Sequence, residues 1–393
     1  MHIAHFTNTY YPSISGVVRS VSSFRQALTE LGHDVFIFTQ DADIEDTEPF
    51  IFRYLSLQLG LPNEFPATIP ISPFMDRVIP ILKPQVIHAH HPIILGQVAA
   101  NKAEELGLPL VFTVHTRYRD YSHYFPVTQE TVQEIVRDAI DRWMNDYLKR
   151  CEHVVVPSES MHTVIEEFYE FSAPITVVPT GIDLRPFVTA NGNGIRKDHG
   201  WDNDFVIISV GRLTPEKGWP TLLKGAAIAM KSIPHSRLAL VGEGFEKKKL
   251  QKLTRELGIA EKVDFLGKVP FDQIPNYLKA ANLFAFASDT ETQGLVTVEA
   301  MAAGLPVVAV NAIGTRDVVD DEVDGLLTEN DPEALAAGLV RMASSREILE
   351  RFRAASIRKA QSMDLLKQAR RLISVYDEAI ASKKAKLSAK KSD

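Results

Sequence analysis

The stretch Leu283–Val310, LFAFASDTETQGLVTVEAMAAGLPVVAV, contains one complete strand–helix–strand unit. Two short apolar runs, Leu283–Phe286 and Val307–Val310, have the length and composition of buried strands. Between them, Leu295–Ala303 has the length and the residue types of a helix. Two strands joined through a helix pair in parallel, so this stretch predicts a parallel α/β sheet.

The same alternation runs along the chain in two separate series. The first series predicts strands at His2–Phe6, Val35–Thr39, Val86–Ala89, Leu110–Val114, Val154–Val156 and Ile175–Val178, and helices at Val17–Leu31, Leu95–Leu106 and Thr131–Lys149. The second predicts strands at Phe205–Val210, Leu238–Val241, Val263–Leu266 and the two runs above, and helices at Thr221–Met230, Glu246–Leu257, Ile274–Ala281 and Leu295–Ala303. We therefore expect an α/β fold with two Rossmann-like, doubly wound domains that face each other across a cleft. Ligands of such sheets bind beyond the carboxyl ends of the strands.

The domain boundaries follow from the break between the two series. Residues 179–200 are rich in Gly, Asn and other polar residues and have no apolar period, which is typical of an interdomain linker. We expect an N-terminal domain over residues 1–180 and a C-terminal domain over residues 181–364. From about Pro332 onward the sequence is helical in pattern, and residues 365–393 are expected to pack back against the N-terminal domain.

Composition excludes several classes of protein. The chain has 393 residues and a formal net charge of −7, which argues against a nucleic-acid partner. Its single cysteine, Cys151, rules out an internal disulfide framework and fits a reducing compartment. No signal-peptide pattern and no membrane-spanning apolar run is present in the sequence, so we expect a cytoplasmic protein.

The loop and helix within the opening stretch predict a phosphate-binding site. Gly294 stands at the turn into the helix, where the backbone N–H groups of Gly294, Leu295 and Val296 have no helical partner. Free N–H groups and the helix dipole make such a terminus suited to anions. Glu291 and Glu299 lie on either side, and carboxylates can accept hydrogen bonds from sugar and ribose hydroxyls. Each glutamate alone also fits a structural role, Glu291 as a helix cap and Glu299 as a solvent-facing helix residue.

Two further segments carry candidate donor-binding residues. VGRLTPEKG, residues 210–218, follows a strand and places Arg212 and Lys217 where they could neutralise a diphosphate. Gly16 lies in the loop between the first strand and the first helix, where a backbone amide could approach phosphate oxygens. Arg212 and Lys217 could also be solvated loop residues, and Gly16 could mark an ordinary tight turn.

Together these segments resemble the family-4 glycosyltransferases of GT-B architecture. The resemblance covers almost the whole chain through FTNTYYPSISGVVRSV, GHDVFIFT, HAHHP, FTVHTRY, TGID, VGRLTPEKG, VGEG, FLGKV and ETQGLVTVEAMAAGLPVVA. The last of these segments is the most specific. Within the family, FTVHTRYRDYSHYFP most resembles the branch of diacylglycerol glucosyltransferases and related lipid glycosyltransferases.

The resemblance implies a donor domain at the C-terminus and an acceptor domain at the N-terminus. It implies retention of the anomeric configuration, a nucleotide diphosphate sugar as donor, and neither a cofactor nor a carboxylate-bound metal. The residues matched to catalysis are His115, Glu291, Arg212 and Lys217, and those matched to donor binding are Gly16, Arg212, Lys217, Lys268, Val269, Glu291, Gly294, Leu295, Val296 and Glu299. In this match His115 lies beside the transferred sugar, Glu299 contacts the ribose, and Lys268 and Val269 meet the base.

One position departs from the family pattern. Many relatives have Glu-Pro-Phe-Gly or Glu-Gly-Phe-Gly where this chain has Glu291-Thr292-Gln293-Gly294. The glutamate and the glycine are kept, so donor chemistry is expected to survive. The change at Thr292 and Gln293 leaves the identity of the sugar open.

Three histidines, His88, His90 and His91, gather after one strand and raise the question of a metal site. Alternation along a strand puts His88 and His90 on one face and His91 on the other. No cysteine accompanies them, and we favour core hydrogen bonding or cleft lining over a metal.

The acceptor is predicted to meet an aromatic and basic segment. Arg117, Tyr118, Tyr121 and Tyr124 follow the strand that ends at His115 and could contact a sugar or a lipid head group. The lysine-rich tail, residues 383–393, could hold the protein at the inner face of the plasma membrane, or could be a solvated, frayed helix end.

The sequence therefore predicts a retaining glycosyltransferase that moves a hexose, most simply from a UDP-sugar, to a diacylglycerol-type lipid or to a saccharide. The alternatives are a sugar-nucleotide epimerase or a phosphorylase on the same scaffold, and a non-catalytic nucleotide-sugar-binding protein.

Overall fold

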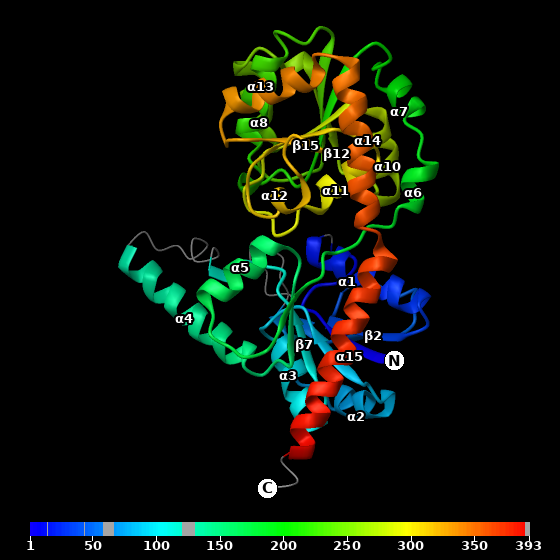
Figure 1. Ribbon diagram of the computed structural model, residues 1–393, viewed down its shortest axis with the longest axis vertical. Coiled ribbons are helices and arrows are strands. Elements are labelled where there is room, and N and C mark those ends of the chain that lie inside the picture. The colour runs from blue at the N-terminus through cyan, green and yellow to red at the C-terminus, as the bar shows by residue number, and fades with distance from the viewer. Residues whose placement is uncertain (14, 43, 58–66, 120–129, 390–393) are drawn as a thin grey trace. The chain divides into compact units, whose positions relative to one another are not determined.

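A computed structural model of residues 1–393 describes all residues except 14, 43, 58–66, 120–129 and 390–393 (Figure 1). The described chain forms two compact units. Unit 1 contains Met1–Gly181 and Leu365–Asp393, and unit 2 contains Ile182–Asp364.

Unit 1 is built around a parallel sheet. Its strands, in the order in which they pair, are β3 (Ile51–Tyr54), β2 (Asp34–Gln40), β1 (His2–Phe6), β6 (Val86–Ala89), β7 (Leu110–Thr113), β8 (His153–Val156) and β9 (Ile175–Val177). Its helices are α1 (Gly16–Glu30), α2 (Pro73–Leu82), α3 (Leu95–Glu105), α4 (Glu130–Leu148), α5 (Glu159–Phe168) and α15 (Leu365–Ala389). A short antiparallel pair, β4 (Ser56–Leu57) and β5 (Ala67–Thr68), lies outside the sheet. The sheet reverses its strand order between β1 and β6.

Unit 2 repeats this plan. Its strands pair in the order β12 (Val263–Gly267), β11 (Ser236–Val241), β10 (Phe205–Val210), β13 (Leu283–Phe286), β14 (Val307–Val310) and β15 (Gly325–Thr328), all parallel. Its α-helices are α6 (Arg185–Thr189), α7 (Asn193–Asp198), α8 (Trp219–Ala229), α9 (Lys247–Glu256), α10 (Ile274–Ala280), α11 (Leu295–Ala302), α12 (Thr315–Val318), α13 (Pro332–Ala343) and α14 (Arg346–Ser362), with 3₁₀ turns at Pro215–Lys217, Ala260–Lys262 and Phe271–Gln273. The order reverses between β10 and β13. Both sheets confirm the predicted pair of Rossmann-like α/β arrangements.

Each sheet has a hydrophobic core on both faces, as expected when helices cover both sides of parallel strands. In unit 1, alternation along β1 sends Ala4 and Phe6 to one core and Ile3 to the other. Ile3 meets α1 and α15, so the side chain of His5 is directed to the same face as these two helices.

The final helix confirms the expectation that the C-terminal segment returns to the N-terminal domain. α15, red in Figure 1, packs against α1, β6 and β7, and its Leu372 and Tyr376 are buried in unit 1. The helix continues to Ala389, and Lys383 donates to the buried carboxylate of Glu152 at 3.0 Å. The interpretation of Lys383 as part of a frayed, solvated end is therefore wrong.

The predicted linker is also wrong in extent. Within residues 179–200, α6 and α7 form and pack in unit 2, where Phe187 and the adjoining Trp201 are buried. Arg196 on α7 donates to the backbone carbonyls of Trp201 and Asp204, and these hydrogen bonds hold the segment against unit 2. The glycine and asparagine content of this segment predicted a loop, although Phe187 and Trp201 anchor it in the core of unit 2.

No helix among the described residues is long and apolar enough to cross a membrane.

The packing of α15 predicts a large cost for truncating its buried side. Leu372 is 0% exposed, and Leu372→Ala is expected to lower the free energy of unfolding of unit 1 by about 2–5 kcal/mol. The matched control is Ile81→Ala, because Ile81 on α2 is 73% exposed and should change stability by less than about 0.5 kcal/mol. Urea unfolding monitored by amide exchange in β1 and β6 measures both, and equal effects would contradict the packing of α15.

Candidate functional site

The predicted donor-binding residues of unit 2 lie on loops that leave the carboxyl edge of its sheet. Arg212 and Lys217 follow β10, and Glu291 follows β13. These are the two strands between which the strand order reverses. In doubly wound sheets, ligands bind beyond the carboxyl ends of the strands at such a point.

Lys217 and Glu291 form an ion pair between these two loops. Each side chain is 17% exposed, so the pair is largely shielded from water. Arg212 is more open, and its Nη2 donates to Glu216 Oε1 at 3.3 Å. The structure thus pairs two of the four residues matched to catalysis, Lys217 and Glu291, and places Arg212 on the same loop as Lys217.

Hydrogen bonds fix the loop that carries Arg212 and Lys217. Trp219 Nε1 donates to the carbonyl of Arg212 at 2.8 Å, and the Thr214 hydroxyl donates to Glu216 Oε1 at 2.7 Å. The hydroxyl of Ser288, on the loop after β13, donates to the carbonyl of Glu216 at 3.2 Å. The interpretation of Lys217 as a merely solvated loop residue does not fit its ion pair with Glu291, whereas the side chain of Arg212, 67% exposed, still fits that interpretation.

Two glycines allow the loops to approach each other. Gly218 has φ +65°, and a Cβ there would stand 2.0 Å from the carbonyl oxygen of Ala287. Gly314, after β14, has φ +79°, and a Cβ there would stand 2.5 Å from the carbonyl oxygen of Glu291. Only glycine avoids both the steric collision and the backbone strain, so these residues set the spacing between the loops.

Helix α11 begins at the same edge. Gly294 is its N-cap with φ +71°, and no side chain caps the helix. The amides of Leu295 and Val296 occupy its first turn, where N–H groups have no intrahelical acceptor. Because no side chain supplies a cap, the interpretation of Glu291 as a helix-cap carboxylate is wrong.

Glu299 lies one turn into α11 and is 3% exposed. Its interpretation as a solvent-facing helix residue is therefore wrong as well.

Lys268 and Val269 follow β12 at the same edge, beyond a hydrogen bond from Gly242 N–H to the carbonyl of Gly267 at 2.8 Å. Each predicted donor-binding residue of unit 2 is thus found near a carboxyl strand end or in the helix that follows it.

In unit 1, Gly16 and His115 also follow strands of the sheet. Gly16 is the first residue of α1, capped by the Ser15 hydroxyl, so the expectation that it lies in the preceding loop is wrong by one position. Among the described residues, no atom lies within 4 Å of where a Cβ of Gly16 would point. A tight turn therefore does not explain the glycine.

His115 follows β7 and ends a buried chain of hydrogen bonds. The hydroxyl of Tyr376 contacts His5 Nε2 at 3.1 Å, and His5 Nδ1 contacts His90 Nε2 at 3.0 Å. His90 Nδ1 in turn contacts His115 Nε2 at 2.9 Å. Nothing in the sequence pattern pointed to Tyr376, which reaches this site only because α15 returns to unit 1.

His88 forms a branch of the same network. Its Nδ1 contacts the hydroxyl of Tyr376 at 2.7 Å, and its Nε2 contacts Thr113 Oγ1 at 2.7 Å. His91 faces the other way and accepts a hydrogen bond from Asn8 N–H at 3.1 Å. The predicted division of the histidines between two faces is confirmed.

Burial keeps these imidazoles neutral. Desolvation lowers the pKa of His5 and of His115 to about 3 and the pKa of His91 to about 4. The pKa values of His88 and His90 lie well below 6.5, first through burial and then through neighbouring histidines. A neutral imidazole offers one donor and one acceptor, so His115 is suited to a hydroxyl group.

The predicted acceptor segment is described in part. Tyr118 packs edge-on to Trp143 of α4, with ring centroids 6.2 Å apart, and Arg117 precedes it. Arg119 pairs with Asp141 at 3.2 Å and lies over the ring of Phe168. Tyr121 and Tyr124 lie outside the described residues.

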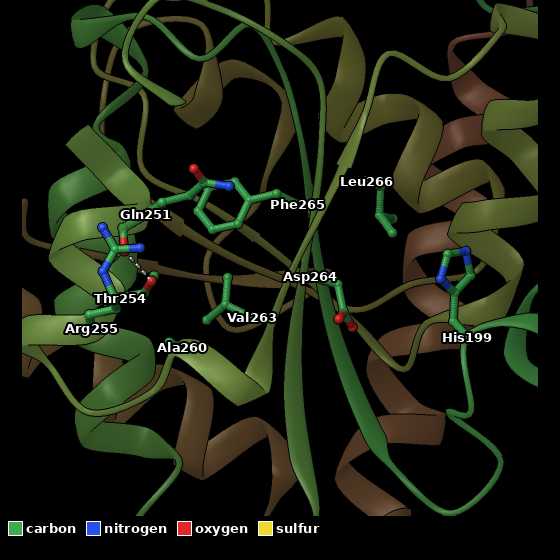
Figure 2. A pocket seen from close by; sticks show the side chains of 9 residues that line it. All are labelled: His199, Gln251, Thr254, Arg255, Ala260, Val263, Asp264, Phe265 and Leu266. Atoms are coloured by element: carbon green, nitrogen blue, oxygen red, sulfur yellow. Dashed lines mark hydrogen bonds between the residues drawn. The ribbon is translucent and has the colours of Figure 1, made fainter. Parts of the chain in front are cut away.

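A hollow of about 610 Å³ lies elsewhere on unit 2, along the edge strand β12. Figure 2 shows Asp264 and His199 on one side of this strand and Arg255 on the other. Asp264 accepts hydrogen bonds from Trp201 and Arg237 and so serves the core. None of the predicted site residues that the structure describes lines this hollow.

Comparison with known proteins gives two family matches. Residues 14–185 match the model described as Glycosyltransferase Family 4, and residues 193–359 match Glycosyl transferases group 1. The chain is 30% identical over 366 residues to an alpha-monoglucosyldiacylglycerol synthase of Acholeplasma laidlawii, which covers 89% of this chain and 90% of the relative. It is also 30% identical over 313 residues to a D-inositol 3-phosphate glycosyltransferase of Thermobispora bispora, covering 75% and 71% of the two chains.

Solved structures share the fold. A sucrose-phosphate synthase from Thermosynechococcus elongatus superposes with a TM-score of 0.78 at 22% identity, covering 97% of this chain and 99% of that one. The Anabaena protein HepE, solved in complex with UDP-glucose, gives a TM-score of 0.74 at 20% identity, covering 96% and 99%.

The neutral histidines predict a stability that depends on pH. The unfolded chain binds a proton at each histidine near pH 6.5, whereas the folded chain does so only near pH 4 for His91. The contribution of such a histidine to the free energy of unfolding is fully present above about pH 6.5. It decreases as the pH falls toward 4, by about 1.4 kcal/mol per pH unit for each such histidine. His91→Gln is expected to reduce this slope by about that amount.

Urea unfolding of unit 1 between about pH 7 and pH 4.5, monitored by amide exchange, measures the slope. Thr163→Ala, at an exposed position of α5, is the control within the same unit; it removes no ionisable group and should leave the slope unchanged. An identical slope in wild type and His91→Gln would contradict a neutral His91.

Proposed function

Since this chain belongs to the family-4 glycosyltransferases, we propose that it transfers glucose from UDP-glucose to a diacylglycerol-type lipid with retention of configuration. The observation that carries the proposal is the convergence of Arg212, Lys217, Glu291 and the N-terminus of α11 at one edge of unit 2. The relatives described above are transferases, which favours transfer over epimerisation, phosphorolysis or simple binding.

Departure of a nucleoside diphosphate builds negative charge, and this edge supplies groups that stabilise it. Lys217 carries three N–H donors, so it can hold Glu291 and still donate to a phosphate oxygen. The amides of Leu295 and Val296 add neutral donors with a favourable dipole. Preorganised donors of this kind stabilise the charge that develops in the transition state.

The two glutamates are proposed to recognise hydroxyl groups. Glu291, held by Lys217, would accept hydrogen bonds from the transferred sugar, and Glu299 from the ribose. Lys268 and Val269 would offer backbone groups to the base. None of these residues is assigned as a nucleophile, and we propose attack on the face from which the diphosphate departs.

In unit 1 the roles follow from chemistry and from the resemblance. Gly16 would let a backbone amide approach the distal phosphate, which fits the open space at its Cβ position. His115 would hydrogen-bond to the transferred sugar as a neutral imidazole. Arg117 and Tyr118 are proposed to meet the acceptor, together with Tyr121 and Tyr124.

If the acceptor is a lipid, the enzyme acts at a membrane surface. The Acholeplasma relative is named for a diacylglycerol product, and this supports the same acceptor class here. We propose that the protein is cytoplasmic and peripheral at the inner face of the plasma membrane. Lys384 and Lys386, exposed near the end of α15, could contact anionic lipids.

The donor proposal predicts selective stabilisation by uridine nucleotides. UDP at 100 times its Kd should raise the free energy of unfolding of unit 2 by about 2.7 kcal/mol, and GDP and ADP should do less. Glu299→Gln should weaken the UDP effect, because the ribose loses a charged acceptor. A thermal-shift series with UDP, GDP and ADP measures this.

The matched control is Glu261→Gln, an exposed position in unit 2 that should keep the full UDP response. Stabilisation by GDP or ADP in place of UDP would reject uridine as the base, and an unchanged response in Glu299→Gln would remove Glu299 from the donor site.

The transfer proposal predicts α-glucosyl diacylglycerol from UDP-glucose and diacylglycerol in mixed anionic vesicles. Lys217→Gln should lower kcat by roughly 100- to 1000-fold, the size of losing one preorganised donor to a developing anion. Lys224→Gln, on the exposed side of α8, is the control and should retain activity. Product configuration is read by NMR. A β-linked product, or transfer to inositol phosphate but not to lipid, would contradict the proposal.

A further inference from the structure

The network in unit 1 joins four elements that are far apart in sequence. Tyr376 comes from α15, His5 from β1, and His88 from β6. His90 follows β6 and His115 follows β7. His5, His88, His90 and Tyr376 are almost fully buried, so water does not compete for their polar atoms.

From this geometry we propose that Tyr376, His5 and His90 form a hydrogen-bonded relay that positions His115 and couples its tautomer to the C-terminal helix. The catalytic importance of the relay rests on the role proposed above for His115 at the transferred sugar. Tyr376, His5 and His90 are positioning residues, since each acts on His115 through another side chain.

Proton counting gives the relay two arrangements in which the hydroxyl proton of Tyr376 is itself hydrogen-bonded. A neutral imidazole has one N–H donor and one acceptor nitrogen, and the hydroxyl of Tyr376 has a single proton. If Tyr376 donates to His5 Nε2, then His5 must donate from Nδ1 to His90, and His90 from Nδ1 to His115 Nε2. His115 then carries its own proton on Nδ1.

The second arrangement reverses every bond. Tyr376 donates to His88 Nδ1 and accepts from His5 Nε2. His90 then donates from Nε2 to His5, and His115 donates from Nε2 to His90. His115 Nδ1 is a donor in the first arrangement and an acceptor in the second.

The same proton count fixes the hydrogen bonds of His88. In the first arrangement His88 donates from Nδ1 to Tyr376 and accepts at Nε2 from the hydroxyl of Thr113. In the second it accepts at Nδ1 and donates from Nε2. The four relay histidines, His5, His88, His90 and His115, therefore share one tautomer in each arrangement, all Nδ1–H or all Nε2–H.

A metal ion is the competing explanation for part of this cluster. Nitrogen atoms of His5, His88 and His90 lie within 4.8 Å of one another. All six ring nitrogens of these residues already have a hydrogen-bond partner at 2.7–3.1 Å. A metal would require several of these bonds to break, whereas the relay satisfies all of them.

The relay is tested first by NMR of the full chain labelled with ¹⁵N in histidine side chains. Ring nitrogen shifts distinguish the two neutral tautomers, and single His→Asn variants assign the signals. The expected result is one common tautomer for the four relay histidines in wild type. Tyr376→Phe should break this correlation, and Tyr147→Phe should not, because the buried Tyr147 hydroxyl donates to the Gly96 carbonyl outside the relay.

Kinetics provide the second measurement. Tyr376→Phe is expected to lower kcat for glucosyl transfer by roughly 10- to 100-fold while the Kd for UDP stays unchanged. Tyr147→Phe should retain wild-type kcat. If Tyr376 had a purely structural role, Tyr376→Phe and Tyr147→Phe would lower the stability alike, and the tautomer of His115 would be the same as in wild type.

Different tautomers among the four relay histidines of wild type would overturn the relay, as would one equivalent of metal retained by the untagged protein. An unchanged kcat in Tyr376→Phe would remove its importance for catalysis. If wild type transferred no sugar but its four histidines shared one tautomer that Tyr376→Phe uncoupled, the relay would stand and the proposed function would fail.

Discussion

A parallel sheet delivers the ends of all its strands to one edge, and the position of the site in each unit depends on this directional constraint. In unit 2 the loops after β10, β13 and β14 leave that edge side by side, and their backbones approach so closely that Gly218 and Gly314 admit no side chain. The ion pair between Lys217 and Glu291 is a consequence of this approach, because residues far apart in sequence are held at contact distance by the loops beneath them.

In each unit the candidate residues lie at the carboxyl edge of the sheet, but the electrostatic character of this edge differs between the units. Unit 2 presents charges and helix-terminal amides that suit a diphosphate. Unit 1 places His115, an imidazole that burial keeps neutral, directly after β7, and this group suits a hydroxyl group. The neutral network depends on α15, since Tyr376 bridges His5 and His88. The C-terminal helix thus contributes to the polar interior of unit 1 as well as to its apolar core.

Around the proposed donor residues, secondary structure could be predicted further than burial. The strand and helix positions around Glu291 and Glu299 were correct because apolar periodicity is strong there. The burial of Glu299 was not foreseen, because a carboxylate in a helix is usually exposed and only the packing of α11 shows otherwise. The linker was overestimated because Phe187 and Trp201 anchor a segment whose composition is that of a loop.

By itself, the sequence determined the parallel α/β class and the two strand–helix series, and it supplied the residues that we propose for the donor site, since these depend on local periodicity and on residue type. Tertiary structure alone decided which side chains meet. His5 and Tyr376 are 371 positions apart and join one hydrogen-bond network, and Gly314 takes its role from the carbonyl of Glu291 on another loop. Such contacts depend on the order in which strands pair and on the return of α15, and neither leaves a periodic signal along the chain.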